Sequence, residues 1–481
     1  MDATRVLEAY EPLFQPKTIA VVGASTRGTA LPNVFIRRIR EFGYEGAIYP
    51  IHPTAKEIDG LPAYRGLGET PEPVDYAYIA IAAAQVPPLL AAGKGRVRFA
   101  QVISSGFGEV DEGKALQEAL AAAARAGGMR LLGPNCLGIY TPRGRVTFAE
   151  IGPREVGEVG IISQSGGLGT DIIRRGLNRG LKFSGLITVG NCADIVPTDI
   201  LEFYLADPQT RVIGLYIETA KDGRRLFETL RDARARKPVV VLKGGRTQQG
   251  RAAAASHTGS LAGDERVWIA LSKQTGCVMV DTLDQFIDAL LVFQALRPHA
   301  ARPTRRVVLF GNGGGTSVLA TDYFARLGLD VLPFDRPAID ALAAMKLPPG
   351  TSITNPVDCP VGTLQQDDGR VAEKILDVIY AHGSPDALVM HLNLSAFVGR
   401  TKKEVLDNLV DAALRVQERH PGKAHFALVL RSDGEPTLEE RKREFRARAV
   451  SLGIPVYDEM ANAGHALAAL QAHERFVNSR S

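Results

Sequence analysis

The histidine most suited to chemistry in this sequence lies among small residues and hydroxyls. His257 belongs to the run 252–263, which reads Ala-Ala-Ala-Ala-Ser-His-Thr-Gly-Ser-Leu-Ala-Gly and contains little that would need a packed core. A solvent-reachable imidazole in such a loop can act as a nucleophile, a general base or a ligand. When the loop is considered alone, a histidine that only caps or hydrogen-bonds a turn remains the alternative.

An anion-binding turn is predicted upstream of this histidine. Residues 159–163, Val-Gly-Ile-Ile-Ser, have the apolar character of a buried strand, and the serine- and glycine-rich run 164–170 leads from it into a helical pattern. The first N–H groups of a helix have no intrahelical acceptor and favour negative charge. We therefore expect Ser165, Gly166 and Gly167 to bind a phosphate group.

A carboxylate follows the second predicted strand after residues 159–163. Glu218 comes directly after a predicted strand at 212–217, and a further predicted strand at 238–242 precedes the histidine loop. Because parallel strands end at the same edge of a sheet, the carboxylate, His257 and the Ser165 turn should meet there. Such a set suits phosphoryl transfer through histidine, with Glu218 orienting the ring and the turn holding the phosphoryl oxygens. The alternative for Glu218 is a surface ion pair with Lys221, Arg224 or Arg225.

A weaker form of the same pattern opens the chain. An apolar run at 17–22 ends at Gly23, followed by Ala24 and Ser25, and a helical pattern covers 33–42. Strand, small-residue turn and helix in this order place free N–H groups where a pyrophosphate binds. Ser25 stands where a dinucleotide fingerprint has its second glycine. A nucleotide-like ligand and an ordinary strand-to-helix turn therefore both fit.

Further strands alternate with helical segments in this part of the chain, which predicts a doubly wound parallel sheet. They cover residues 47–50, 76–81, 99–103 and 129–132. Small or polar residues follow the strands, among them Lys56, Ser105, Gly106 and Asn135, as a crevice for an extended ligand would require. The second strand leads into Pro-Ile-His-Pro at 50–53 and lacks the acidic residue that holds the ribose of an adenine dinucleotide. A nicotinamide dehydrogenase is therefore disfavoured.

The pattern of strand, glycine-rich turn and helix occurs a third time. A Pro- and Arg-rich stretch at 296–304 indicates a domain boundary, after which a strand at 306–310 leads into the turn 311–317. Later strands are expected at 387–390, 427–430 and 454–457. The polar turn 354–358 is expected to have a structural or interface role.

These patterns predict an α/β protein with three doubly wound domains. The expected boundaries are 1–150, 151–298 and 305–481, with the histidine loop in the second domain. The irregular spacing of the three glycine-rich turns indicates three similar domains and not a solenoid.

Composition excludes several classes of function. The 481 residues carry a net charge of only +4, so we expect no nucleic-acid partner and no membrane surface. The four cysteines are far apart and form no Cys-x-x-Cys pair, so we predict neither a disulfide framework nor a metal site. The sequence begins without an apolar signal region, and no run approaches the length of a membrane span. We expect a cytoplasmic protein.

Five motifs, in order along nearly the whole chain, resemble the α subunit of ADP-forming acyl-CoA synthetases, relatives of the α subunit of succinyl-CoA synthetase. They are Gly-Pro-Asn-Cys-Leu-Gly at 133–138, Ser-Gln-Ser-Gly-Gly at 163–167, Asp-Pro-Gln-Thr at 207–210, Ser-His-Thr-Gly-Ser at 256–260 and Asn-Pro-Val-Asp at 355–358. Succinyl-CoA synthetase has Gly-His-Ala-Gly around its histidine. The form found here, together with the third domain, is similar to the ADP-forming acyl-CoA synthetases.

The resemblance implies a Rossmann-like CoA-binding domain followed by two flavodoxin-like domains. It also implies the reversible conversion of acyl-CoA, ADP and phosphate into a carboxylic acid, CoA and ATP, through an acyl phosphate and a phosphohistidine. By motif position, His257 is the phosphoryl carrier, Glu218 holds it, and Ser165, Gly166 and Gly167 receive the phosphoryl group. The CoA contacts implied in the same way are Gly23, Ala24, Ser25, Lys56, Ser105, Gly106 and Asn135.

One part of the family's machinery is expected on another chain. The nucleotide step needs an ATP-grasp domain, and no segment of this sequence is left to form one. We therefore expect a separate ATP-grasp β subunit that binds ATP or ADP with Mg, in an α2β2-type assembly. A non-catalytic regulator that binds CoA or acyl-CoA is the alternative, but it would be expected to lose the His257, Glu218 and Ser165 set. The small carboxylic acid is expected near the loop 189–194, and the sequence does not identify it.

Overall fold

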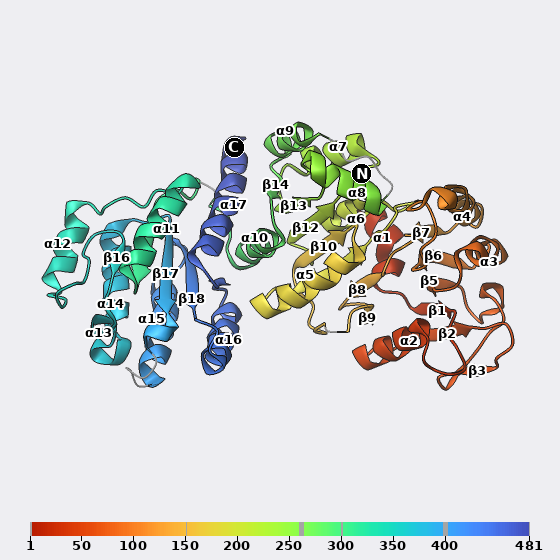
Figure 1. Cartoon of the computed structure of the whole chain (residues 1–481), viewed down its shortest axis with the longest axis horizontal. Helices are drawn as coiled ribbons and strands as arrows, with labels where there is room; N and C mark the ends of the chain where they lie inside the picture. Colours follow the sequence, from red (N-terminus) through yellow and green to blue (C-terminus); the bar gives the residue numbers. More distant parts are fainter. Residues whose placement is uncertain (1, 151, 259–263, 300–301, 398–402, 481) are drawn as a thin grey trace. The chain divides into compact units, whose positions relative to one another are not determined.

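Three parallel β-sheets organise the computed structural model of this protein (Figure 1). It describes residues 2–150, 152–258, 264–299, 302–397 and 403–480, with the backbone alone at 255–258 and 403. The chain forms two compact units, Met1–Phe286 and Ile287–Ser481. The first unit contains two of the sheets and the second contains the third.

The first sheet is built from apolar runs that are buried on both faces. Its strands are β1 (Thr18–Val22), β2 (Ala47–Ile51), β5 (Val74–Ile79), β6 (Val97–Val102) and β7 (Arg130–Leu132), and its helices are α1 (Ala3–Phe14), α2 (Leu31–Phe42), α3 (Val86–Ala92) and α4 (Lys114–Ala126). A small antiparallel hairpin, β3 (Glu57–Ile58) and β4 (Leu61–Pro62), follows β2. The spatial order is β2-β1-β5-β6-β7, with every pair parallel. Helices α3 and α4 lie side by side (Figure 1).

The second sheet repeats this order and adds an antiparallel edge. Its strands are β8 (Ile139–Thr141), β9 (Val146–Thr147), β10 (Val159–Ser163), β11 (Phe183–Thr188), β12 (Val212–Ile217), β13 (Val239–Lys243) and β14 (Val278–Val280), and its helices are α5 (Gly166–Arg179), α6 (Pro197–Ala206), α7 (Gly223–Ala233), α8 (Gln248–Thr258) and α9 (Glu265–Thr275). The order is β14-β13-β12-β10-β11-β8-β9. Strands β8 and β9 pair antiparallel, and β8 pairs antiparallel with β11.

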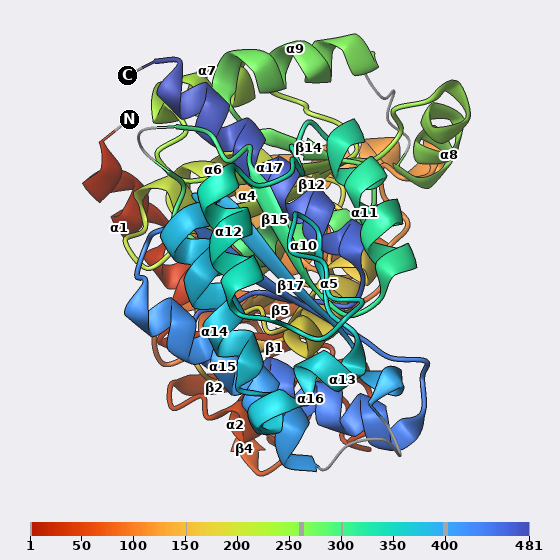
Figure 2. The same cartoon turned by 90° about the vertical axis from the view of Figure 1, so that its left-hand side faces the viewer.

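The third sheet lies in the second unit, and the chain passes from the first unit to the second within α10 (Leu283–Ala295). Its strands are β15 (Val307–Gly311), β16 (Val357–Asp358), β17 (Ala387–Asn393), β18 (His425–Arg431) and β19 (Val456–Tyr457), and its helices are α11 (Gly314–Arg326), α12 (Arg336–Ala344), α13 (Val361–Leu364), α14 (Val371–Val378), α15 (Lys403–Arg419), α16 (Pro436–Ser451) and α17 (Met460–Asn478). The order is β16-β15-β17-β18-β19. Helices α11 and α17 lie side by side (Figure 2).

All three sheets share one topology. Numbered within each sheet, and leaving out the antiparallel β8 and β9, the strand order is 2-1-3-4-5, the flavodoxin-like form of the doubly wound fold. Each glycine-rich turn recognised in the sequence follows the first strand of its sheet, at the point where the order reverses. The predicted α/β class with three doubly wound sheets is therefore confirmed, while the expected boundaries at 150, 298 and 305 remain predictions.

Several elements differ from the sequence-based expectation. The hairpin β8–β9 lies within the range expected for the first domain, yet it pairs with the second sheet. Its strands contain only 3 and 2 residues, too few for a periodic signal. The run 252–258, expected to be a loop, forms the second half of α8. Its four consecutive alanines are strong helix formers, and this propensity outweighs the absence of an apolar face.

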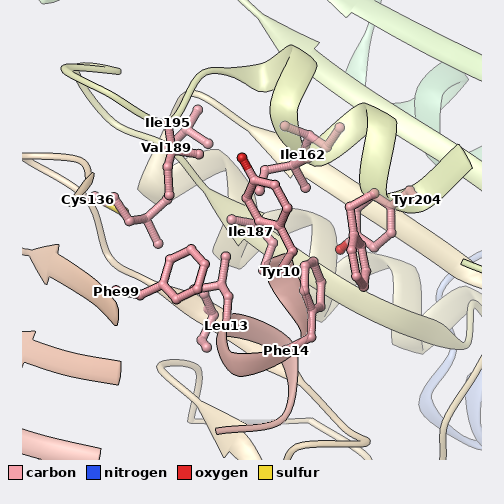
Figure 3. Close-up of a cluster of buried hydrophobic side chains, with 14 of the residues drawn as sticks. Tyr10, Leu13, Phe14, Phe99, Cys136, Ile162, Ile187, Val189, Ile195 and Tyr204 are labelled. Carbon is pink, nitrogen blue, oxygen red and sulfur yellow. The ribbon is translucent and has the colours of Figure 1, made fainter. Parts of the chain in front are cut away.

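A shared core joins the first two sheets. Helix α1, which the sequence analysis did not predict, carries Leu13 and Phe14 into this core, where both are fully buried. In Figure 3, Leu13 and Phe14 lie among Phe99 from the first sheet and Ile187 and Tyr204 from the second sheet and its helices. The two sheets are therefore held together by apolar burial and not only by the chain connection.

Phe14 is the centre of this contact. Its ring stacks on Phe203 with 3.9 Å between centroids and an interplanar angle of 8°. The guanidinium of Arg143 lies 5.2 Å from the centroid of Phe14 and 5.1 Å from that of Phe203. The Thr141 hydroxyl donates to the Phe14 carbonyl over 2.8 Å. These contacts attach α1 to α6 and to the β8–β9 hairpin.

None of the helices within the described residues has the length and apolar character required to cross a membrane.

Phe14→Ala is expected to lower the free energy of unfolding of the first unit by about 3–5 kcal/mol, because it removes a buried ring and leaves a cavity. Trp268, the one tryptophan of the chain, lies in α9 of this unit, so urea unfolding followed by its fluorescence measures the change. Leu31→Ala, at a position that is 51% exposed, is the control and should change the value by less than about 0.5 kcal/mol. Equal effects of the two substitutions would contradict the shared core.

Candidate active site

The residues that could take part in chemistry meet in the second sheet, at the point where its strand order reverses. Strands β10 and β12 are neighbours there, with Ser163 in register with Tyr216. Helix α5 follows β10 and α7 follows β12, and the connections diverge because β11 lies on the other side of β10. The carboxyl ends of β10 and β12 therefore bring the Ser165 turn and Glu218 together.

The start of α5 carries N–H groups that are free to bind an anion. Ser165 is the N-cap residue, and its hydroxyl oxygen accepts the N–H of Leu168 over 3.3 Å. The Ser163 hydroxyl donates to the Ser165 carbonyl over 2.7 Å, which fixes the turn from the strand side. The N–H groups of Gly166 and Gly167 have no acceptor among the residues that the structure describes. Two donors at the positive end of the helix are thus available to a phosphoryl group.

The two glycines of this turn differ in whether packing requires them. A Cβ on Gly166 would lie 2.6 Å from Cγ of Leu137, so the close approach of the first domain requires glycine there. A Cβ on Gly167 would meet no heavy atom within 4 Å. Packing therefore does not require the second glycine.

Glu218 is 5% exposed, and both its carboxylate and its backbone carbonyl accept hydrogen bonds. The Tyr216 hydroxyl donates to its Oε1 over 2.9 Å, and the Lys243 ammonium donates to its backbone carbonyl over 2.8 Å. The cations considered as alternative ion-pair partners bond elsewhere: Lys221 to two backbone carbonyls, Arg224 to Glu228, and Arg225 to Asp199 and Glu202. The surface ion pair is therefore not the arrangement of Glu218 in this structure.

Gln164 is a positioning residue that the sequence analysis did not identify. Its Oε1 accepts the N–H groups of Glu218 and Thr219, the latter over 2.9 Å, and its Nε2 donates to the Thr219 carbonyl over 2.8 Å. This amide joins the end of β10 to the end of β12 directly beside Ser165. Its place between two serines in the 163–167 motif was the only sequence signal.

Burial controls the charges around Glu218. Desolvation lowers the pKa of Lys243 to about 8, against the opposing attraction of Glu218, and Arg246 and Arg251 lower it further. Burial also raises the pKa of Tyr216, and the adjacent Glu218 carboxylate adds to this effect. Tyr216 therefore remains a neutral donor to the carboxylate at physiological pH.

His257 lies in the last turn of α8, and its side chain is outside the described residues. Helix α8 follows Gly244 and Gly245 at the end of β13, next to β12 in the sheet. The backbone thus leaves the sheet at the edge that holds Glu218, as the sequence predicted. Contact between His257 and Glu218 remains a prediction, as do all roles assigned to the site residues.

A cavity of about 390 Å³ lies between the first domain and the start of α5. Its lining combines the three predicted phosphate residues with the predicted CoA contact Asn135. The remaining lining residues are Ile103, Cys136, Leu137, Gln164, Gly190 and Asn191. Burial raises the pKa of the Cys136 thiol to about 12 and that of Cys192 to about 11. Both thiols are neutral at physiological pH, so neither suits nucleophilic chemistry.

The predicted CoA turn after β1 is tightly constrained. Gly23 has φ +96°, and a Cβ there would lie 2.3 Å from the Ala80 carbonyl oxygen. The buried side chain of Asn33 accepts the Ser25 N–H over 2.8 Å and donates to the Ser25 carbonyl over 3.0 Å. Ala24 is buried. The backbone N–H of Ser25 is therefore occupied. Its hydroxyl oxygen accepts the Arg27 N–H over 3.0 Å, which leaves the hydroxyl hydrogen as a donor for a ligand.

The other predicted CoA contacts lie at neighbouring strand ends. Ser105 and Gly106 follow β6 and are exposed, and Lys56 is exposed between β2 and β3. The N–H of Gly106 donates to the Glu109 carboxylate. A ligand could therefore use this N–H only by displacing Glu109.

Two groups in the second unit have structural roles. Asn355 accepts the Leu309 N–H over 3.0 Å and donates to the Val307 and Leu332 carbonyls, and Asp358 accepts the Gly313 N–H over 2.9 Å. This is the structural role expected for the turn 354–358.

Potential metal ligands also converge in this unit, where His299, His425 and Glu474 place ligand atoms within 4.8 Å of one another. Both Glu474 oxygens already accept backbone N–H groups, from His299 over 2.7 Å and Thr304 over 2.6 Å. The His425 ring also bonds to this carboxylate, over 3.0 Å. These bonds attach the segment before β15 to α17.

Comparisons with known proteins agree with this geometry. Residues 17–142 match a CoA binding domain family, and residues 156–293 match a succinyl-CoA ligase-like flavodoxin domain family. The chain is 36% identical over 471 residues to the α subunit of ADP-forming acetate–CoA ligase I of Pyrococcus furiosus, covering 96% of this chain and 97% of that one. The α subunit of ligase II of the same organism is 34% identical over 460 residues, covering 94% and 96%. The chain belongs to the family of ADP-forming acyl-CoA synthetase α subunits.

A solved structure extends this family assignment to the whole fold. The dinucleotide-forming acetyl-coenzyme A synthetase 1 of Ca. Korarchaeum cryptofilum, solved with phosphate and ADP, is 30% identical, with a TM-score of 0.82 over 98% of both chains. The resemblance drawn from the five motifs is thus confirmed. Membership of this family of ligases supports the catalytic interpretation over that of a regulatory CoA-binding protein.

Lys243→Met tests the electrostatics beside Glu218. Because the folded-state pKa of Lys243 is about 8 and that of an unfolded lysine is about 10.4, the unfolded state binds more protons between these values. The stability of the wild type relative to the variant should therefore rise as pH increases from about 8 to about 10.4, and should be constant below this window. Urea unfolding of both proteins across this range measures the difference. A constant difference throughout would show that Lys243 titrates normally.

Proposed function

We propose that this chain performs the acyl and first phosphoryl transfers of an ADP-forming acyl-CoA synthetase. Phosphate attacks the thioester carbonyl of acyl-CoA, which releases CoA and forms an acyl phosphate. A nitrogen of His257 then attacks the phosphorus, and the carboxylic acid leaves as the P–O bond breaks. In the last step ADP accepts the phosphoryl group from the phosphohistidine, which yields ATP and regenerates the imidazole.

The observation that carries this proposal is the start of α5. Two free N–H groups, on Gly166 and Gly167, open into a cavity that is also lined by Asn135 of the first domain. The shared cavity supports the proposal, because the first transfer requires the phosphoryl oxygens and CoA to lie close together. Preorganised N–H donors stabilise the charge that develops on transferred oxygens.

The remaining residues take roles around this centre. The Glu218 carboxylate, held by Tyr216 and by the Gln164 amide, orients the His257 ring and stabilises its positive charge during transfer. In the first domain, CoA lies along Gly23, Ala24, Ser25, Lys56, Ser105, Gly106 and Asn135.

The nucleotide step is assigned to a partner. The relatives are named as α subunits, which supports a separate β subunit for this chain. We assign that subunit an ATP-grasp fold that binds ADP or ATP with Mg, and the assembly an α2β2 form in the cytoplasm. The domains are taken as 1–150 for CoA, 151–298 for the histidine and 305–481 for the second flavodoxin-like domain. The acid is a small carboxylic acid.

Labelling tests the histidine. Incubation of the full chain with radioactive phosphate and acetyl-CoA, or another member of an acyl-CoA panel, should give a protein-bound label that is labile to acid and stable to alkali. His257→Ala should abolish the label, and Glu218→Gln should slow its appearance by about a hundredfold, the scale of losing a charged positioning group. His382→Ala, at an exposed histidine of the second unit, is the matched control. Label that persists in His257→Ala would overturn the assignment.

The same labelled protein tests the partner. ADP added to the isolated chain should leave the label in place, and ADP together with the β subunit should release it as ATP. Discharge by ADP alone would disprove the need for a separate subunit.

Gly167→Ala separates the phosphate site from stability. An added Cβ meets no atom within 4 Å, and alanine is the better helix former by about 1 kcal/mol, so the fold should be at least as stable. The methyl group would lie beside the N–H donor of the same residue, and labelling should slow by at least about tenfold, which is less than the hundred- to thousandfold loss on removing an oxyanion donor. Labelling rates and urea unfolding are compared on the same preparation. Unchanged labelling would remove Gly167 from the phosphate site.

A further inference from the structure

A polar bridge connects the predicted CoA side of the cavity to the histidine half of the first unit. Asn191, in the loop after β11, donates from Nδ2 to Oε2 of Glu109 and, over 3.0 Å, to Oε1 of Gln117. Glu109 lies in the loop after β6, and Gln117 lies in α4. The ammonium of Lys221, which follows β12, donates to the Asn191 carbonyl over 2.7 Å. Asn191 is therefore held by elements from both sheets, through its side chain by Glu109 and Gln117 and through its backbone by Lys221.

The bonds of Glu109 determine which way the Asn191 amide faces. The second oxygen of Glu109, Oε1, accepts the N–H groups of Gly106 and, over 3.2 Å, Phe107. Burial opposes ionisation of Glu109, but the bonds from Asn191, Gly106 and Phe107 keep its pKa below the usual value. An ionised carboxylate can only accept, so the NH2 group of Asn191 must face it.

Gln117 imposes the same orientation. Its Oε1 accepts the Gly108 N–H over 3.1 Å, so the oxygen and not the nitrogen of this amide lies on the side of Asn191. Both Asn191 hydrogens are thus used, and its Oδ1 faces away from the first-domain loop. This oxygen accepts from Nδ2 of Asn135 over 3.4 Å.

Glu109 therefore sets the orientation of the Asn191 amide, and the Asn191 amide in turn sets the orientation of the Asn135 amide. Asn135 is exposed at the cavity and has φ +55°, a left-handed backbone conformation that places its amide there. With one hydrogen directed at Asn191, the second hydrogen and the carbonyl oxygen of the Asn135 amide are presented in one fixed arrangement to a ligand. An amide that turned over would present the opposite pattern of donor and acceptor.

We propose that Glu109 is a positioning residue that sets the donor and acceptor pattern of Asn135 at the CoA end of the cavity, acting through Asn191. This rests on the proposed function, because it takes Asn135 as a contact of CoA. The carboxylate makes no contact with the ligand in this role. Its effect is to preorganise an amide that would otherwise adopt both orientations.

Glu109→Gln replaces one acceptor oxygen of the carboxylate with an NH2 donor and keeps the size of the side chain nearly constant. The backbone N–H groups of Gly106 and Phe107 cannot turn, so the single oxygen of the substituted side chain should remain with them. Its NH2 group would then oppose the NH2 group of Asn191, which would turn over and force Asn135 to turn as well. The dissociation constant of CoA, measured by calorimetry on the full chain, should rise about tenfold, equivalent to about 1.4 kcal/mol.

Two further variants distinguish orientation from a general effect on the loop. Glu112→Gln removes the same charge from an exposed position of the same loop, and it should leave CoA affinity unchanged. Gln117→Glu, combined with Glu109→Gln, supplies a carboxylate that again accepts from Asn191 and from Gly108. Because charge-assisted bonds are the stronger ones, this double variant should bind CoA within about threefold of the wild type.

Labelling by acetyl phosphate provides a readout that does not involve CoA. Transfer from acetyl phosphate to His257 should proceed at the wild-type rate in Glu109→Gln, since α5 and Glu218 are untouched. Loss of this transfer, or failure of Gln117→Glu to restore CoA binding, would show that Glu109 only maintains the loop. CoA binding that is equal in the wild type and Glu109→Gln would also overturn the proposal. A wild type that binds no CoA would instead refute the proposed function.

Discussion

The amide of Gln164 is the contact on which the candidate site most depends. It accepts two backbone N–H groups from the segment after β12 and donates to a carbonyl of the same segment. Ser165 is its immediate neighbour, so the start of α5 and the segment that carries Glu218 are fixed relative to each other. Without this link, two strand ends would share a sheet edge but not a defined separation.

The surroundings of the site favour transfer of charged groups without competing chemistry. Burial keeps the Cys136 and Cys192 thiols protonated and Tyr216 neutral. The cavity itself is lined by amides, small residues and apolar side chains. The N–H groups at the start of α5 are thus available to a negatively charged ligand, and the lining thiol of Cys136 is protonated. Preorganised dipoles of this kind stabilise developing charge at low cost in reorganisation.

The repeated 2-1-3-4-5 topology explains why the three glycine-rich turns look alike in sequence. Each one follows the first strand of its sheet, where the connections diverge and a ligand can approach the backbone. The surroundings nevertheless differ. The turn after β1 is held by Asn33, the turn after β10 opens into a cavity, and the turn after β15 is bonded by Asp358. One topology thus provides three sites of different accessibility.

Local pattern alone determined most strands of the three sheets, because apolar runs of five or six residues between glycine-rich turns have few other arrangements in an α/β protein. The short strands β14 and β16 were not predicted. Local pattern also determined the candidates Ser165 and Glu218, since residues at carboxyl ends of parallel strands share one edge. Tertiary structure decided what such local patterns do not contain. Helix α1 becomes the core between two sheets, β8 and β9 cross to the second sheet, and the alanine run before His257 becomes helical.

The hydrogen bonds of Gln164, Asn191 and Glu109 were likewise visible only in three dimensions. Their partners lie tens of residues away in the sequence, and an isolated glutamine, asparagine or glutamate has no periodic signature. A side chain that acts by hydrogen bonding across two elements is specified by the register and spacing of both. Sequence therefore predicted which groups could do the chemistry, and packing decided which groups hold them in place.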